Sequence, residues 1–355
     1  MSKYLSNRFL GMEPYAPGEQ PQNRQYIKLN TNESPFPPAP GVLDAISRAE
    51  IQRLNLYPDP DTQVTADIIA ANFHLNRENV ILGNGSDELL SFCFQAFCDA
   101  DMPACFPDIS YGFYKVFARI LCIPTRIYPL DSDLKVVPAD YCPAGGTVFL
   151  ANPNAPTGMI LGLAEIETIL KSNPDNVVVV DEAYVDFGAE SAYRLIDRYG
   201  NLIVVQTMSK SRNLAGARIG YALACEELIS DLNSMRFSFN PYNLNRLSLL
   251  AGAAAIQDTV YFTSCTGKIQ EIRAFTVEEL EKRGFSVLPS LANFIFVRPN
   301  RISGKSYYLR LKDKGVLVRH FTQSRIGDYV RITIGTKEQM QALLNATDEL
   351  WEEAI

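Results

Sequence analysis

Histidine is almost absent from this chain of 355 residues, which contains only His74 and His320. A zinc site built on histidines, or a Ser-His-Asp triad, therefore has very few candidate residues. The seven cysteines are scattered and include no C-x-x-C pair. An odd number of unpaired cysteines is typical of reduced thiols, so we expect a cytoplasmic protein without bound metal.

Positive charge is not in excess and long hydrophobic runs are missing. Lys and Arg number 33 against 40 Asp and Glu, which leaves a formal charge of −7 and argues against nucleic acid or an anionic membrane as a partner. The apolar stretch at 249–256 is too short to span a bilayer, and the first residues lack the continuous apolar segment of a signal peptide.

The order of elements predicts an α/β protein. Apolar runs at 79–82, 147–150, 177–180 and 202–205 show no alternation, as expected for strands covered on both faces, and helical patterns lie between them. The length predicts roughly two domains. We expect an N-terminal arm over 1–45, a large domain over 46–243 with a mostly parallel sheet, and an interdomain helix with a smaller α+β domain over 244–355.

Three motifs follow these apolar runs, at the strand ends where open α/β sheets bind ligands. Lys210 lies just after the run at 202–205, with Ser209 beside it and Arg218 eight residues later. Asp181 ends the run at 177–180, where an acid is costly to bury without a cationic partner. The sequence Gly-Asn-Gly-Ser-Asp-Glu at 83–88 is a glycine turn that leads into a helix N-terminus, which suits a phosphate.

Together these motifs predict a site for pyridoxal 5'-phosphate. A lysine amine can form a Schiff base with its aldehyde, a buried acid keeps its ring nitrogen protonated, and the glycine turn holds its phosphate. Each motif alone is weak, but their order at successive strand ends is a strong signal.

At this point the sequence resembles the fold-type I pyridoxal-phosphate aminotransferases, and among them the histidinol-phosphate aminotransferase family. The resemblance runs from Glu-Pro-Tyr at 13–15 to Arg-Ile-Thr-Ile-Gly-Thr at 331–336. It implies a large domain with a seven-stranded type of sheet flanked by helices, plus a smaller α+β domain.

The resemblance also implies roles for individual residues. Lys210 matches the Schiff-base lysine, Asp181 the partner of the ring nitrogen and Tyr184 the tyrosine that contacts the ring hydroxyl. Tyr111 matches the aromatic side chain that stacks on the ring. The residues implied to hold the phosphate are Ser86 and Asp87 through their amides, Ser209, Arg218 and, from the other subunit of a homodimer, Tyr57.

One position departs from the family pattern. The family usually has Asn directly before Pro-Thr-Gly, where it contacts the ring hydroxyl, but Ala155 stands there in this chain. Either Asn154 substitutes from one position earlier, or Tyr184 makes that contact alone.

On the substrate side, the resemblance implies that Arg331 binds an α-carboxylate and that Asn32 belongs to the active site. Arg319, and Tyr15 from the partner subunit, match residues that approach the substrate's phosphate. A planar guanidinium suits both anionic groups.

These matches imply an aminotransferase of histidine biosynthesis that uses histidinol phosphate or a related amino acid, with 2-oxoglutarate and glutamate as the second pair. An aromatic amino acid aminotransferase, or a decarboxylase of a phosphorylated amino acid such as threonine phosphate, remains an alternative on the same scaffold. A non-enzymatic descendant is disfavoured, because a binding protein has no physical need for a nucleophilic lysine opposite an acid.

Overall fold

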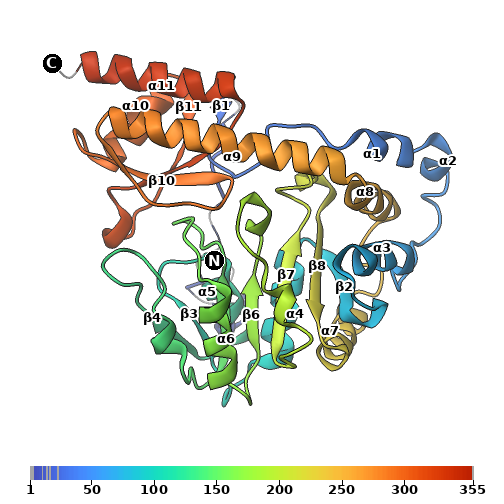
Figure 1. Ribbon diagram of the computed structural model, residues 1–355. Coiled ribbons are helices and arrows are strands. Elements are labelled where there is room, and N and C mark those ends of the chain that lie inside the picture. Colours follow the sequence, from blue (N-terminus) through green and yellow to red (C-terminus); the bar gives the residue numbers. More distant parts are fainter. Residues whose placement is uncertain (1–3, 10, 13–14, 16, 22–23, 354–355) are drawn as a thin grey trace.

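The fold is that of a computed structural model, which describes the chain except residues 1–3, 10, 13–14, 16, 22–23 and 354–355. A large sheet with helices on both faces forms one part, and a small sheet with two helices forms the other (Figure 1). The long helix α9 (Thr259–Lys282) runs across the top of the molecule from one part to the other. In the described residues no helix is both long and apolar enough to cross a membrane.

The large sheet has seven strands in the order β2-β8-β7-β6-β5-β3-β4. Only β8 runs antiparallel to its neighbours, β2 and β7. The strands are β2 (Val80–Asn84), β3 (Ala104–Pro107), β4 (Thr125–Tyr128), β5 (Thr147–Ala151), β6 (Val178–Asp181), β7 (Leu202–Thr207) and β8 (Ile219–Ala224).

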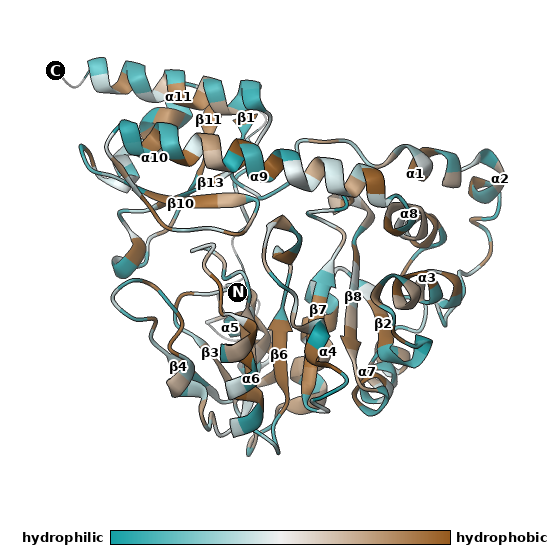
Figure 2. Ribbon diagram, in the orientation of Figure 1, coloured by the Kyte–Doolittle hydropathy of each residue, from teal (hydrophilic) through white to brown (hydrophobic). Residues whose placement is uncertain are grey.

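The central strands are buried on both faces, which explains why their sequences show no polar alternation. Along β6, Val178 and Val180 enter the core cluster on one face of the sheet, whereas Val179 enters the cluster on the other. Figure 2 shows β6 in the hydrophobic colour. Helices supply the cover on both sides, so polar groups of this sheet reach a ligand only at the strand ends.

Two groups of helices cover the sheet. The first face packs on α3 (Gln63–Phe73), α6 (Leu163–Ser172) and α8 (Arg246–Gln257). The second packs on α4 (Ser86–Phe97), α5 (Phe113–Leu121) and α7 (Glu226–Phe239). The short helices α1 (Pro40–Ala45) and α2 (Arg48–Ile51) contact α8.

The small part is an antiparallel four-stranded sheet in the order β12-β13-β10-β9. Its strands are β9 (Phe285–Val287), β10 (Phe294–Pro299), β12 (Arg319–His320) and β13 (Val330–Thr333). The helices α10 (Gly304–Asp313) and α11 (Lys337–Glu352) pack against it. Their core cluster also includes residues of α9, which ties the two parts together.

The N-terminal segment belongs structurally to the small part. Its strand β1 (Ile27–Lys28) pairs in parallel with β11 (Val316–Leu317). Glu19 binds Lys312 and Tyr308 of α10, so the described residues of 15–32, which we call the strap, are held against the small part before the chain enters the site.

The predicted fold class is confirmed, with differences in detail. The interdomain helix expected after residue 243 is two helices, α8 and α9, divided at Asp258. The helix α8 packs into the core of the large sheet, whereas α9 also contributes to the core of the small part. The short strands β3 and β4 and the reversed β8 were not predicted, because their runs are short or interrupted by glycine.

Candidate active site

A cavity of about 470 Å³ lies between the carboxyl ends of the large sheet's parallel strands and the small sheet. Its size is ordinary for a small-molecule site. The predicted residues that line it are Tyr15, Asn32, Ser86, Asp87, Tyr111, Asp181, Tyr184, Ser209, Lys210, Arg218, Arg319 and Arg331. Residues from strand ends far apart in the sequence therefore meet in one place.

Lys210 follows β7 and its amine reaches into the cavity. Nζ donates a hydrogen bond of 3.3 Å to the carbonyl oxygen of Thr31 in the strap. Burial, and after it the nearby charge of Arg331, lower the pKa of Lys210 to about 8, while Glu33 opposes the shift. The amine is therefore closer to its neutral, nucleophilic form than an exposed lysine is.

Asp181 ends β6, the strand next to β7, and its side chain is buried. Oδ2 accepts a hydrogen bond of 3.0 Å from Tyr114, and Oδ1 accepts one of 3.3 Å from the amide of Ala183. Burial raises the pKa of Asp181 to about 7, although the Tyr114 hydroxyl opposes the shift. Among the described residues no cation pairs with this carboxylate, so a protonated ring nitrogen is the partner that its position calls for.

The glycine turn forms a tight cradle at the start of α4. Gly85 has φ +79°, a conformation that side chains rarely adopt, and a Cβ there would lie 2.6 Å from Nη2 of Arg218. Gly220 of β8 packs so closely that its own Cβ would lie 2.5 Å from the amide nitrogen of Ser86. The helix N-terminus and the guanidinium therefore meet at one point, as binding of a phosphate requires.

The side chains around the cradle form hydrogen bonds with one another. Asp87 accepts hydrogen bonds from the Tyr111 hydroxyl, at 2.5 Å, and from Nη2 of Arg218, at 3.1 Å. The Ser209 hydroxyl accepts a hydrogen bond of 3.0 Å from Thr207. The Tyr111 ring lines the cavity and meets Tyr114 edge-on, so its face is fixed relative to Asp181.

Tyr184 and Asn32 form the link between the large sheet and the strap. Nδ2 of Asn32 donates a hydrogen bond of 3.0 Å to the Tyr184 hydroxyl. Asn32 has φ 55°, which asparagine tolerates better than most residues, and its amide and side-chain oxygen both contact Thr333 of β13. One asparagine thus connects the strap, the small sheet and the cofactor side of the cavity.

The two substrate-side arginines lie on the small sheet. Nη2 of Arg331 donates a hydrogen bond of 3.1 Å to the carbonyl oxygen of Asn30, and Nη1 of Arg319 donates one of 3.1 Å to that of Pro17. Burial lowers the pKa of Arg331, and the charge of Arg319 acts in the same direction. Nε of Arg331 is buried without a hydrogen-bond partner in the described part of the chain.

Asn154 and Ala155 differ in their relation to the cavity. Asn154 does not line the cavity, because its side chain is used within the loops: it donates to the Ile109 carbonyl and to Thr157, and accepts from Ser110. Ala155 lines the cavity instead. Tyr184, the other residue expected to contact the ring hydroxyl, lines the cavity.

The two tyrosines expected from the partner subunit differ from each other. Tyr15 lines the cavity of its own chain, where its ring stacks on Phe113 at 4.3 Å between centroids. Its expected neighbours Glu13 and Pro14 lie outside the described residues. Tyr57 lies away from the cavity, is 76% exposed and stacks on Tyr242.

Several residues of the site were not predicted. Tyr114, which bonds Asp181, lies one helical turn after Tyr111 and could have been found from that spacing. The Thr31 carbonyl, Phe113 and Phe321 had no signal, because the contacts of a backbone atom, of the first residue of α5 and of a loop side chain depend on how the two parts assemble. No cluster of three or more potential metal ligands occurs within the described residues.

A family model matches most of the chain. Residues 24–346 match the model described as aminotransferase class I and II. The chain belongs to the class I and II aminotransferases.

This aminotransferase is similar to curated proteins over its whole length. It is 47% identical to the histidinol-phosphate aminotransferase of Marinomonas sp. (strain MWYL1), over 99% of this chain and 100% of the relative. It is 46% identical to that of Brachyspira hyodysenteriae, over 96% of each chain. The structure of the Sinorhizobium meliloti histidinol-phosphate aminotransferase in complex with pyridoxal-5'-phosphate has a TM-score of 0.89 at 24% identity, and covers 100% of this chain and 99% of that one. The predicted resemblance is thus confirmed.

Proposed function

We propose that this aminotransferase binds pyridoxal 5'-phosphate and moves the amino group of histidinol phosphate to 2-oxoglutarate, a step of histidine biosynthesis. The observation that carries the proposal is that Lys210, Asp181 and two substrate-side arginines line one cavity. The similarity to histidinol-phosphate aminotransferases over nearly the full length supports the same substrate.

The buried residues fit this cofactor. When bound, it supplies an aldehyde that takes up the amino group and a ring that accepts electrons from the substrate's carbon. Asp181 would hold the ring nitrogen, Tyr111 would lie against the ring and Tyr184 would contact its hydroxyl. The amides of Ser86 and Asp87, with Ser209 and Arg218, would hold the phosphate.

Lys210 has two tasks in this proposal. Its amine would hold the cofactor; once a substrate amine has taken its place, Nζ would accept the proton from the substrate's amine-bearing carbon and deliver it to the carbon that was the cofactor's aldehyde. A lowered pKa suits both tasks, because each requires the neutral amine at some stage.

The two substrates use the arginines differently. Histidinol phosphate has no carboxylate, so its phosphate would depend on Arg319 and Tyr15. The acceptor 2-oxoglutarate has two carboxylates, and Arg331 would bind the one beside the keto group while Asn32 keeps Tyr184 in place.

We also propose that the working unit is a cytoplasmic homodimer. Large exposed side chains gather on α1, α2, the segment that follows them and the end of α7: Leu43, Ile51, Leu54, Leu56, Tyr57, Phe237, Phe239 and Tyr242. So much exposed apolar surface is typical of an interface. Tyr57 belongs to this surface, which supports its role at the phosphate of the neighbouring subunit. All seven cysteines are free, which suits the cytoplasm.

A spectrophotometric titration tests the function. The protein loaded with cofactor should absorb in the visible range; histidinol phosphate should bleach that band and 2-oxoglutarate should restore it. Bleaching by aromatic amino acids but not by histidinol phosphate would favour an aromatic aminotransferase. Release of carbon dioxide from threonine phosphate without amino transfer would favour the decarboxylase.

A further inference from the structure

Two arginines of the small sheet face each other across a strand pair. Arg319 of β12 is the direct partner of Arg331 in β13, and both line the cavity. Direct partners in an antiparallel ladder project on the same face of a sheet, and like charges at such positions are destabilising. The sheet therefore carries a repulsion that must be offset by neighbouring groups.

The ring of Phe321 contacts both guanidinium groups. The guanidinium carbon of Arg319 lies 5.9 Å from the ring centroid, and that of Arg331 lies 5.8 Å from it. The face of an aromatic ring attracts cations. Arg331 also lies 5.3 Å from the centroid of the Phe294 ring, so Phe321 is the ring that the two charges share.

Other contacts hold this arrangement in place. The Phe321 ring packs edge-on against Phe296 at 5.9 Å between centroids. The two guanidinium groups are anchored to different carbonyl oxygens of the strap, those of Pro17 and Asn30. The two arginines are therefore held as separate hydrogen-bond donors. To bind the same anion, they would have to break their hydrogen bonds to the strap.

We propose that Phe321 is a specificity-determining residue, which holds Arg319 and Arg331 as two anion subsites at a fixed spacing. The cavity then selects compounds whose two anionic groups match that spacing, such as dicarboxylates of one chain length. This inference rests on the proposed function only in taking the cavity as the substrate site.

Dicarboxylates without an amino or keto group test the spacing without any turnover. Dissociation constants of malonate, succinate, glutarate and adipate for the cofactor-loaded protein would be measured by isothermal titration calorimetry. We expect the wild type to prefer one length over the worst by about tenfold, and Phe321→Leu to reduce that preference to about threefold or less. Phe321→Tyr, which keeps the ring, should retain the preference.

The control is Tyr329→Leu. Tyr329 packs on Phe296 in the same cluster but does not line the cavity, so this variant should keep the wild-type length preference. Thermal melting and the cofactor's absorbance would show that each variant is folded.

The inference would be overturned by a wild type without length preference, by Phe321→Leu with an unchanged preference, or by an equal loss of affinity for all four compounds. None of these outcomes depends on amino transfer. A failure of histidinol phosphate as donor would contradict the proposed function and leave the dicarboxylate result standing.

Discussion

At the scale of single residues, the site works by burying charges whose partners arrive with the ligand. Asp181 lacks a cationic partner among the described residues, and Arg331 has a buried Nε without an acceptor there. Such groups cost free energy in the ligand-free protein. The pKa values of such buried groups should therefore differ measurably from their ordinary values, in directions that follow from the surroundings.

The amine of Lys210 should lose its proton at a lower pH than an ordinary lysine does. Acetylation by acetic anhydride requires the neutral amine, so in the cofactor-free protein the labelling rate of Lys210 should rise with pH and reach half its maximum near pH 8. Mass spectrometry of the peptide measures this rate. Arg331→Gln should move the midpoint up and Glu33→Gln should move it down, because these charges act on the amine in opposite directions.

Lys171 provides a control in the same digest. It is exposed and paired with Glu167, which raises its pKa, so it should be labelled only at higher pH. A midpoint for Lys210 near that of an ordinary lysine would contradict the expectation.

Asp181 should make the cofactor-free protein less stable as the pH rises. Its folded-state pKa of about 7 exceeds the usual 3.8, so the folded state binds a proton more tightly than the unfolded state does. Stability from this group is present below pH 4 and is lost as the pH rises through 7. Asp181→Asn does not ionise, and should raise the melting temperature at pH 8 relative to wild type but not at pH 4.

Differential scanning fluorimetry at the two pH values checks this expectation. Glu182, whose pKa burial also raises to about 7, is common to both proteins and cancels in the comparison. Equal melting temperatures at pH 8 would mean that Asp181 is stabilised by a partner in solution. The variant should still lose amino transfer, because the ring nitrogen loses its carboxylate.

At the scale of elements, the phosphate cradle depends on the close approach of β8 to the turn before α4. Gly220→Ala would put a Cβ 2.5 Å from the carbonyl carbon of Gly85 and from the amide nitrogen of Ser86, and both are backbone atoms that must shift. We expect affinity for pyridoxal phosphate to fall about tenfold or more, close to 1.4 kcal/mol. Fluorescence titration of the cofactor-free protein measures it.

The matched control is Gly216→Ala in the connection before β8. A Cβ at that position meets nothing within 4 Å, so affinity should remain near that of wild type. Pyridoxal without the phosphate should bind Gly220→Ala and wild type alike. An equal loss for both compounds would show general misfolding instead of a damaged cradle.

The secondary-structure elements also explain which residues of the site could be predicted from the sequence. Lys210 and Asp181 were predictable because apolar strands buried on both faces place polar groups only at their ends. The position of the Asn154 side chain could not be predicted in the same way, because a side chain in a turn can form its hydrogen bonds within the loops. Asn154 does so with Ile109 and Thr157. The Thr31 carbonyl and Phe321 reach the site through the assembly of the strap and the small sheet, which leaves no local pattern.

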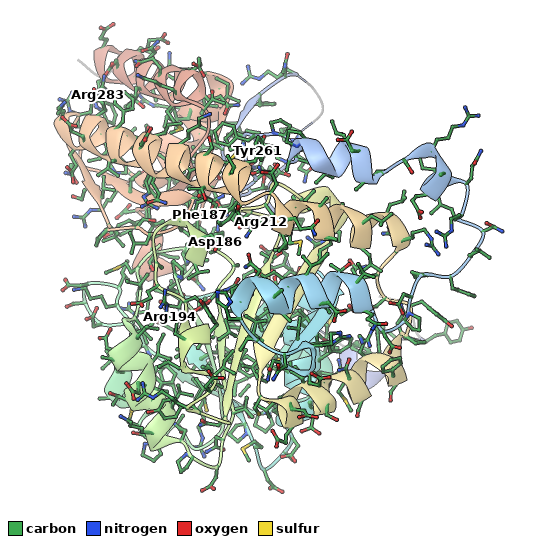
Figure 3. All side chains as sticks on the ribbon, turned by 45° about the vertical axis from the view of Figure 1, so that its right-hand side comes forward. Asp186, Phe187, Arg194, Arg212, Tyr261 and Arg283 are labelled. Carbon is green, nitrogen blue, oxygen red and sulfur yellow. The ribbon has the colours of Figure 1, made fainter. Side chains whose placement is uncertain are left out.

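The two residues that follow Lys210 attach its connection to other elements of the fold. Ser211 donates to Asp186, and Arg212 donates to the Ala255 carbonyl of α8 while its guanidinium lies 3.6 Å from the centroid of the Phe262 ring on α9. Figure 3 shows Asp186 and Arg212 below α9, the helix that also carries Tyr261. The connection that bears Lys210 is thus fastened to the helix that joins the two parts.

At the scale of the whole molecule, the exposed aromatic surface around Tyr57 should be an interface that completes the site. Mixing Lys210→Ala with Tyr57→Ala protein after partial unfolding and refolding should restore activity, although each variant alone is impaired. In the mixed dimer, one site combines an intact Lys210 with the intact Tyr57 of the other chain. Turnover after mixing measures this recovery.

Refolding each variant by itself is the control for the mixing. No gain in activity on mixing would mean that Tyr57 acts within its own chain or not at all. Analytical ultracentrifugation of the wild type gives the second measurement, and a monomer at working concentration would contradict the dimer.

The reversed direction of β8 has a consequence for how the site forms. Because β7 and β8 are antiparallel neighbours, the single connection between them carries Ser209, Lys210 and Arg218 to the same edge of the sheet. The groups for both ends of the cofactor therefore come from one short stretch of chain, whose closure costs little entropy. Asp181, Ser86 and Tyr111 come from other segments of the chain and reach the site only when the strands of the sheet have paired. We therefore expect the part of the site that contains Lys210 to form locally, and the part that contains Asp181 and Tyr111 to form with the sheet.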